Sequence, residues 1–88
     1  MRFELGRVVA TPGALDAMEE AGTEPSELLR RHLGGDWGEL DAHDRRENQL
    51  SLKHGFRVLS SYPVGGQKVW IITEADRSAT TMLLPSEY

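Results

Sequence analysis

The sequence contains no cysteine, so disulfide bonds, thiolate nucleophiles and zinc sites that need sulfur ligands are excluded. It also has no long hydrophobic run, and the Met1-Arg2-Phe3-Glu4 start carries no apolar segment of the kind found in a signal peptide. We therefore expect a cytoplasmic protein that does not interact with a membrane. Nothing in the sequence suggests a cofactor.

With only 88 residues, the chain is too short to divide into two separately packed cores. Its apolar fraction of 39% is sufficient for one core, and its nine glycines and four prolines are ordinary usage. Residues 1–88 are therefore expected to form a single α+β domain.

Basic residues are few, and the net charge is −4. Carboxylates concentrate in residues 16–27 and 36–47, where they include Glu19, Glu20, Asp41 and Asp44. Such charges are usually the solvated faces of helices, but they can also form an acidic surface that docks onto a basic partner. We expect no nucleic-acid partner, because a negatively charged surface repels phosphate.

The first half of the chain predicts a strand and two or three short helices. Phe3 to Ala10 alternates as a strand does. Thr11-Pro12 and Thr23-Glu24-Pro25 are helix-start signals, and Gly22 and Gly34-Gly35 are the matching stops. Residues 41–54 form either one helix ended by Gly55 or a loop with a helical turn. Trp37, in the glycine-rich loop between, is expected to anchor that loop to the core.

The last third predicts a three-stranded antiparallel meander with helices packed on one face. Its strands are residues 56–64, 68–74 and 79–84, and Gly65-Gly66 suits a two-residue hairpin turn. This turn sets the register so that Tyr62 faces Val69 and an ion pair joins Arg57 to Glu74. The expected core face carries Phe56, Val58, Tyr62, Val69, Ile71, Met82 and Leu84.

The opposite face of this meander is unusually apolar, since it carries Leu59, Trp70, Ile72 and Leu83. Small monomers seldom expose such a patch without using it. Either another part of the chain covers this face, or it is a dimer or partner interface with Trp70 as its anchor.

Reactive side chains do not form a recognisable catalytic motif. No serine lies in a Gly-x-Ser-x-Gly sequence, and the glycine pairs lack the residues that complete a phosphate-binding loop. His43 and Glu47 have helical i, i+4 spacing, which more often gives an exposed pair than a metal site, and we expect no metal. A metal-independent ribonuclease could still use His54, Arg57, Arg77 and Tyr88.

Two stretches of the sequence carry a family resemblance. Gly-Asp-Trp-Gly-Glu-Leu at 35–40 and Trp-Ile-Ile-Thr-Glu-Ala-Asp-Arg-Ser at 70–78, with the residues that follow to Tyr88, resemble a family of small bacterial plasmid-related proteins found on plasmids and integrative elements. The element order is also similar to that of RelE/ParE-type toxins. The first resemblance implies a role on a mobile genetic element, and the second implies a toxin or ribonuclease.

The lack of a reactive cluster favours a non-enzymatic interaction protein of a mobile element, in its most concrete form an anti-defence or anti-restriction modulator. The expected partner is a protein, either a different one or a second copy of this chain. The residues predicted to bind it are Leu59, Trp70, Ile72, Leu83, Glu19, Glu20, Asp41 and Asp44. The alternative is a RelE/ParE-like toxin or metal-independent ribonuclease.

Overall fold

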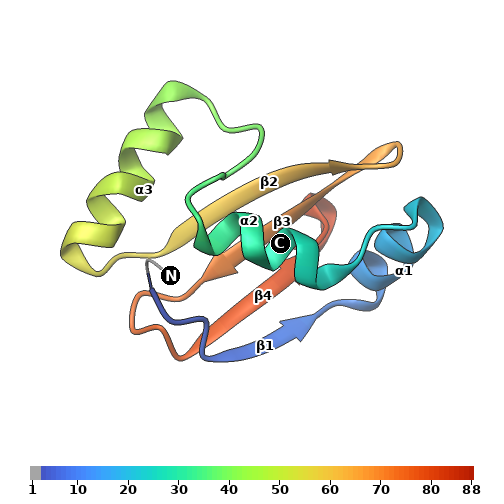
Figure 1. Ribbon diagram of the computed structural model, residues 1–88, viewed down its shortest axis with the longest axis horizontal. Coiled ribbons are helices and arrows are strands. Elements are labelled where there is room, and N and C mark those ends of the chain that lie inside the picture. The colour runs from blue at the N-terminus through green and yellow to red at the C-terminus, as the bar shows by residue number, and fades with distance from the viewer. Residues whose placement is uncertain (1–2) are drawn as a thin grey trace.

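The computed structural model describes residues 3–88 and contains three helices and a four-stranded sheet (Figure 1). In chain order the elements are β1 (Arg7–Ala10), α1 (Pro12–Ala21), α2 (Pro25–Leu33), α3 (Ala42–His54), β2 (Val58–Val64), β3 (Gln67–Thr73), β4 (Ala79–Leu83) and the short 3-10 helix η1 (Pro85–Glu87). The α+β class is thus confirmed. None of the helices in the described part of the chain is long and apolar enough to cross a membrane.

The sheet has the strand order β1-β4-β3-β2. The predicted meander is its antiparallel part, and the predicted register holds, with Tyr62 opposite Val69 and Ile71 opposite Met82. The three-stranded description was incomplete, because β1 adds a fourth strand that runs parallel to β4 and makes the sheet mixed. Such a pairing between the two ends of a chain leaves no local turn signal in the sequence.

The first strand is shorter than the predicted 3–10, because it cannot extend toward the N-terminus past Gly6. Gly6 has a φ of +63°, which extended backbone does not adopt. A Cβ placed there would lie 2.3 Å from the carbonyl oxygen of Arg77 and 2.4 Å from that of Ser78. The N-terminal segment therefore crosses the β3–β4 loop in close contact before it enters the sheet.

The helices begin and end at the predicted signals. The Thr11 hydroxyl accepts a hydrogen bond from the Ala14 N–H at the start of α1, and α1 ends at Gly22. Residues 42–54 form one continuous helix, α3, because the Asp41 carboxylate caps its first turn by accepting from the Asp44 N–H. Gly55, with a φ of +76°, ends it.

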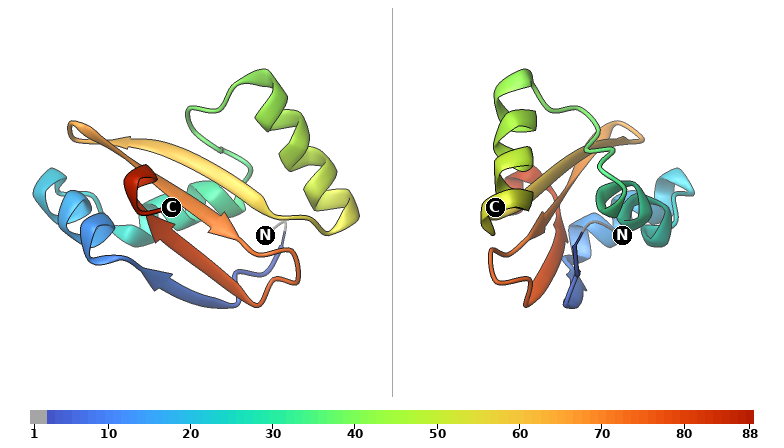
Figure 2. Two further views of the ribbon diagram at one scale, coloured as in Figure 1. Left: turned by 180° about the vertical axis from the view of Figure 1, so that it is seen from behind. Right: turned by 60° about the vertical axis from the view of Figure 1, so that its left-hand side comes forward.

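The sequence predicted that all helices pack on one face of the sheet, and this prediction is wrong. Helices α1 and α2 cover one face, whereas α3 lies on the other side, alongside the edge strand β2 (Figure 2). The reason lies in α3 itself. It carries no apolar stripe, and the residues it buries are the polar Asn48 and Ser51.

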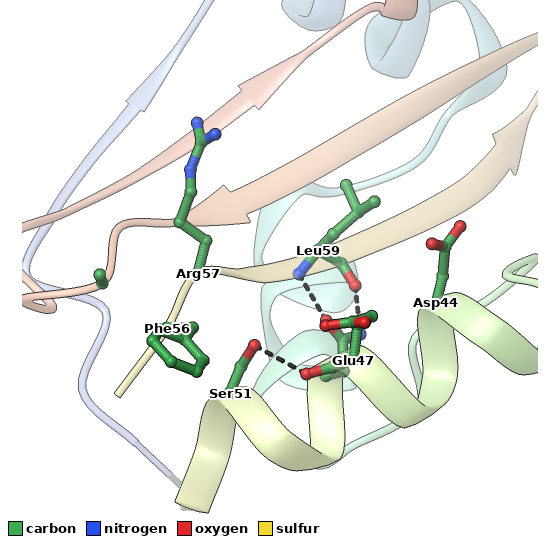
Figure 3. A pocket seen from close by; sticks show the side chains of 8 residues that line it. Asp44, Glu47, Ser51, Phe56, Arg57 and Leu59 are labelled. Atoms are coloured by element: carbon green, nitrogen blue, oxygen red, sulfur yellow. Dashed lines mark hydrogen bonds between the residues drawn. The ribbon is translucent and has the colours of Figure 1, made fainter. Parts of the chain in front are cut away.

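Helix α3 is attached to the sheet through the backbone of β2. Asn48 donates from Nδ2 to the carbonyl oxygen of Leu59 over 2.6 Å, and the Leu59 N–H donates to Asn48 Oδ1 over 3.0 Å, as the dashed lines at Leu59 show (Figure 3). Further along the same edge, Ser61 accepts from the Glu39 N–H and donates to the Trp37 carbonyl. Trp37 is 6% exposed, which confirms its predicted role as the anchor of this loop.

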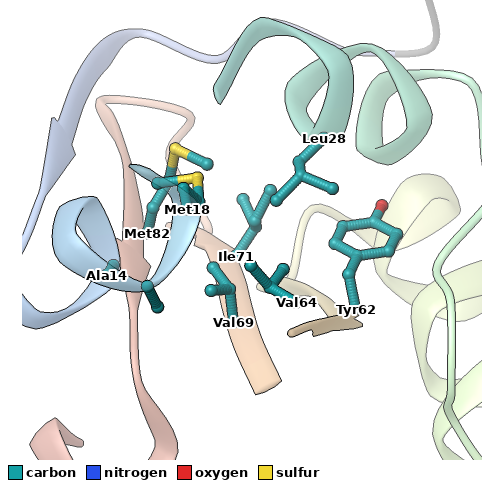
Figure 4. Close-up of a cluster of buried hydrophobic side chains, with 9 residues drawn as sticks. Ala14, Met18, Leu28, Tyr62, Val64, Val69, Ile71 and Met82 are labelled. Carbon is teal, nitrogen blue, oxygen red and sulfur yellow. The ribbon is translucent and has the colours of Figure 1, made fainter. Parts of the chain in front are cut away.

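The core lies between the sheet and helices α1 and α2 (Figure 4). Five of the predicted core residues are buried there: Val58, Tyr62, Val69, Ile71 and Met82. Leu84 is partly buried against them. Phe56 was wrongly assigned to the core. It is 58% exposed because it precedes β2, so the alternation of the strand does not fix its direction.

Candidate functional site

The face of the sheet away from α1 and α2 carries a groove of about 280 Å³. It is lined by Leu59 on β2, by Trp70 and Ile72 on β3, and by Arg57 and Tyr88. The three apolar residues project to this side because their neighbours Val58, Ser60, Val69 and Ile71 project into the core. The groove therefore lies on the apolar face expected from the sequence.

The C-terminal residues lie against part of that apolar face. Ile72 and Leu83 are each only 6% exposed, whereas Leu59 and Trp70 are half-buried. One of the two alternatives left open by the sequence was that another part of the chain, the first strand or the Trp37 loop, covers this face. Instead, η1 lies against β3, and the Tyr88 ring meets the Trp70 ring edge-on at a centroid distance of 5.8 Å.

A short hydrogen-bond network holds this C-terminal turn in place. The Glu87 carboxylate accepts from the Leu84 N–H at 2.8 Å and from the Thr11 hydroxyl at 2.5 Å. The hydrogen bond from Thr11, followed by that from the Leu84 backbone, lowers the pKa of Glu87. Tyr88 is thus positioned by a link between the C-terminal turn and the start of α1.

Arg57 lies at the rim of the groove with its charge already paired. Its Nη1 donates to the Tyr88 hydroxyl at 3.2 Å, and its Nε lies 3.4 Å from Glu74 Oε1. The Tyr88 hydrogen bond, and then the Glu74 carboxylate, raise the pKa of Arg57. The ion pair predicted from the hairpin register is confirmed.

A second hollow of about 450 Å³ adjoins the groove and shares Arg57 and Leu59 with it (Figure 3). Its far wall is α3, which contributes Asp44 and Glu47. The exposed ring of Phe56 also lines it. Because Glu74 already neutralises Arg57, the two α3 carboxylates give this end of the site a negative charge.

The acidic residues predicted to bind a partner form two separate groups. Asp41 and Asp44 lie at the start of α3, and Asp44 lines the second hollow. Glu19 and Glu20 lie on α1, on the opposite side of the sheet (Figure 2). The apolar groove is therefore adjacent to only one of the two groups.

The residues of the alternative ribonuclease reading are only partly brought together. Arg57 and Tyr88 meet in the groove, and the His54 ring lies 6.3 Å from the Phe56 ring. Arg77 instead donates to three backbone carbonyls, those of Phe56 at 2.6 Å, Glu74 at 3.1 Å and Ser51 at 3.1 Å. These bonds fasten the β3–β4 loop to the end of α3, so Arg77 acts as a structural residue at this position.

A buried polar chain was not foreseen from the sequence. His32 on α2 is 0% exposed, and its Nδ1 contacts the Ser60 hydroxyl while its Nε2 lies 2.9 Å from Thr73 Oγ1. Thr73 Oγ1 lies 2.7 Å from Thr80 Oγ1, and the Thr80 hydroxyl donates to the Leu5 carbonyl.

The Leu5 carbonyl can only accept, and with a neutral imidazole this fixes the direction of every hydrogen bond in this buried series. Thr80 donates to Leu5, so Thr73 donates to Thr80 and accepts from the Nε2–H of His32, leaving Nδ1 to accept from Ser60. Burial, and then the Arg77 charge, lower the pKa of His32 to about 4. The imidazole is therefore neutral and structural. The signal that could have revealed it was three hydroxyl residues at core-facing strand positions.

A group of potential metal ligands lies at the start of α3. Atoms of Asp41, His43 and Asp44 lie within 4.8 Å of one another. Asp41 and His43 are exposed, Asp41 already caps the helix, and His43 contacts Asp44 and Glu47 at 3.5 Å. This arrangement is typical of a solvated helix start.

The architecture is thus an α+β domain with a mixed four-stranded sheet and an apolar, acid-flanked groove on its less covered face. No family model, no curated protein and no solved structure matches the chain.

Proposed function

We propose that this protein is a non-enzymatic binding module whose groove takes an apolar side chain of a protein partner that carries Lys or Arg beside it. The observation that carries the proposal is the position of the groove. Leu59 and Trp70 form an apolar floor, and Asp44 and Glu47 stand at the adjoining end. An apolar anchor next to charge-complementary residues is the usual composition of a protein–protein interface.

The ionisable groups around the groove favour binding over catalysis. Arg57 is held by Glu74 and Tyr88, and Arg77 is occupied by backbone carbonyls outside the groove. General acid–base chemistry needs a group that titrates near neutral pH within reach of substrate. His32 has a lowered pKa, but it is buried on the other side of the sheet.

The acidic group on α1 is not part of this site. Glu19 and Glu20 lie across the sheet from the groove, so one small partner segment cannot contact them together with Trp70 (Figure 2). We therefore assign partner binding to the groove and to Asp44 and Glu47, and we keep Glu19 and Glu20 as a matched comparison. The role on a mobile element that the resemblance implies, and the anti-defence or anti-restriction role, stay predictions.

A random peptide library displayed on phage and selected on the immobilised protein tests the proposal. We expect selected peptides with a large apolar residue flanked by Lys or Arg. Their affinity should fall at least about tenfold in Leu59→Ser and remain unchanged in Leu50→Ser. Leu50 is the matched control because it is an exposed leucine on α3 that does not line the groove.

A second pair of variants tests the charge assignment. The double variant Asp44→Asn, Glu47→Gln should weaken the same peptides and reduce the salt dependence of their binding. The double variant Glu19→Gln, Glu20→Gln removes the same charge from α1 and should leave binding unchanged. If selection yields no binder, or if both members of a pair act equally, the groove is not the binding site.

A further inference from the structure

The two edges of the sheet differ in whether their outward backbone groups are hydrogen-bonded. At the β2 edge, Asn48 bonds both backbone groups of Leu59, and the 37–39 loop bonds both backbone groups of Ser61. At the β1 edge, no residue in the described range 3–88 forms a hydrogen bond with the side of the strand that faces away from β4. Proteins ordinarily cover or charge such edges because bare backbone pairs with another strand.

The hydrogen bonds of β1 show which of its groups face outward. The Arg7 N–H donates to the Ser78 carbonyl, and the Thr11 N–H donates to the Met82 carbonyl, each at 2.9 Å. Because successive residues of a strand alternate in direction, Val9 also faces β4. The N–H and C=O groups of Val8 and Ala10 therefore point away from the sheet.

Apart from Arg7 at its start, the side chains of β1 are uncharged and small enough to allow pairing with another strand. Val8 and Val9 are 43% and 42% exposed, on opposite faces of the strand. The segment from Leu5 to Leu15 carries one charge, that of Arg7, and no carboxylate. The strand itself therefore adds no negative charge, and Glu87, which accepts from the Thr11 hydroxyl, is the carboxylate found at its far end, so two copies can approach through β1.

We propose that β1 pairs antiparallel with β1 of a second copy of this chain, about a two-fold axis at Val9. Val8 then lies opposite Ala10 of the second copy, and the outward groups of these residues form two hydrogen bonds at each end of the pairing, four in all. Val9 lies opposite its own copy in a non-hydrogen-bonded pair, where side chains approach most closely. The two sheets join into one continuous sheet.

The neighbouring registers are less favourable. An axis at Val8 retains only the two hydrogen bonds between the Val8 residues, because Gly6, with its φ of +63°, cannot extend the strand to pair with Ala10. An axis at Arg7 places two guanidinium groups directly opposite each other, which is destabilising.

A second copy also explains why only one edge is bare. A subunit with two free edges would add further copies without limit, whereas a subunit with one free edge closes after a single two-fold contact. At the other edge, Asn48 and the 37–39 loop already bond the outward backbone groups of β2, so these groups cannot pair with another strand. The groove lies on β2 and β3, away from β1, so this proposal and the binding module can fail independently.

Sedimentation equilibrium over about 1 µM to 1 mM protein tests the pairing. We expect a monomer–dimer equilibrium that Val8→Pro weakens by at least about tenfold, because proline removes an outward N–H and leaves the ladder to β4 intact. Val8→Thr keeps the N–H and the branched shape, so it should dimerise as the original chain does. A monomer throughout the range, as expected if the edge takes a foreign strand, overturns the proposal.

Cysteine cross-linking tests the register and does not depend on the folding of the proline variant. The chain has no cysteine, so a single substitution reports one position. Val9→Cys should form an intermolecular disulfide readily on mild oxidation, whereas Val8→Cys should form it slowly, because Val8 faces Ala10. Faster cross-linking at position 8, or equal slow rates at both positions, contradicts an axis at Val9.

Discussion

The side chain of Asn48 forms the same pair of hydrogen bonds with Leu59 that a neighbouring strand would form. Its amide donates to the Leu59 carbonyl over 2.6 Å and accepts from the Leu59 N–H over 3.0 Å. A polar helix is thereby attached to a sheet edge without an apolar interface. Asn48 consequently contributes to the attachment of α3 and also to the protection of the β2 edge, which the 37–39 loop completes at Ser61.

Asn48→Ala should destabilise the fold by about 2–3 kcal/mol, because two part-buried backbone groups of Leu59 lose their partners. It should also change the assembly. With the Leu59 groups of the β2 edge open as well as β1, larger oligomers should form in place of a closed dimer. Chemical denaturation measures the first effect and light scattering the second. Leu50→Ala, on the exposed side of α3, should produce neither.

Gly38→Ala should lower the free energy of unfolding by more than about 2 kcal/mol. Gly38 has a φ of +72°, and a Cβ there would lie 2.1 Å from the Ser61 carbonyl oxygen. Gly22→Ala is the control, since Gly22 has a φ of +68° but no atom within 4 Å of the added carbon. It should show only the strain of positive φ, about 1 kcal/mol. Equal losses would mean that the loop moves away from β2 without cost.

His32 should make the fold sensitive to acid. Its pKa is about 4 in the folded protein and 6.5 when unperturbed, so between these values the unfolded chain binds a proton that the folded chain excludes. The free energy of unfolding should therefore be unaffected above pH 7 and fall by about 3 kcal/mol as the pH approaches 4. Urea denaturation at several pH values measures this slope. His32→Gln should remove it, and a slope that persists in that variant would assign the effect to other groups.

Substitution of Arg77 should reduce the stability of the fold much more than substitution of Arg57. Arg77→Ala removes donors to three carbonyls that join the β3–β4 loop to α3, so its melting temperature should fall by several degrees. Arg57→Ala removes an exposed ion pair, so stability should change by less than about 1 kcal/mol. RNA cleavage by the purified protein that is lost in Arg57→Ala would favour the ribonuclease alternative over the binding module.

Local signals predicted most of the fold. Helix caps such as Thr11 and Asp41 and the Gly65-Gly66 turn act over a few residues, and the elements they predict are present at the predicted registers. Phe56 was assigned wrongly because the alternation of a strand says nothing about residues outside it. The parallel pairing of β1 with β4 could not be predicted, because hydrogen bonds between backbone groups carry no side-chain signal.

The candidate site was predicted only in outline. Leu59 and Trp70 follow from strand alternation. The contact of the Tyr88 ring with Trp70 is accompanied by a tertiary link between Thr11 and Glu87, which no spacing in the sequence reveals. The same is true of α3, whose position depends on Asn48 rather than on an apolar stripe.

The parallel partnership of β1 with β4 has a consequence for the order in which the chain can acquire its structure. During synthesis β1 leaves the ribosome well before β4, the strand it docks against, because three helices and two strands lie between them in the chain. Until then the valines of β1 remain without their intramolecular neighbour, and this late closure of a long loop should make docking of the first strand one of the slower events in folding.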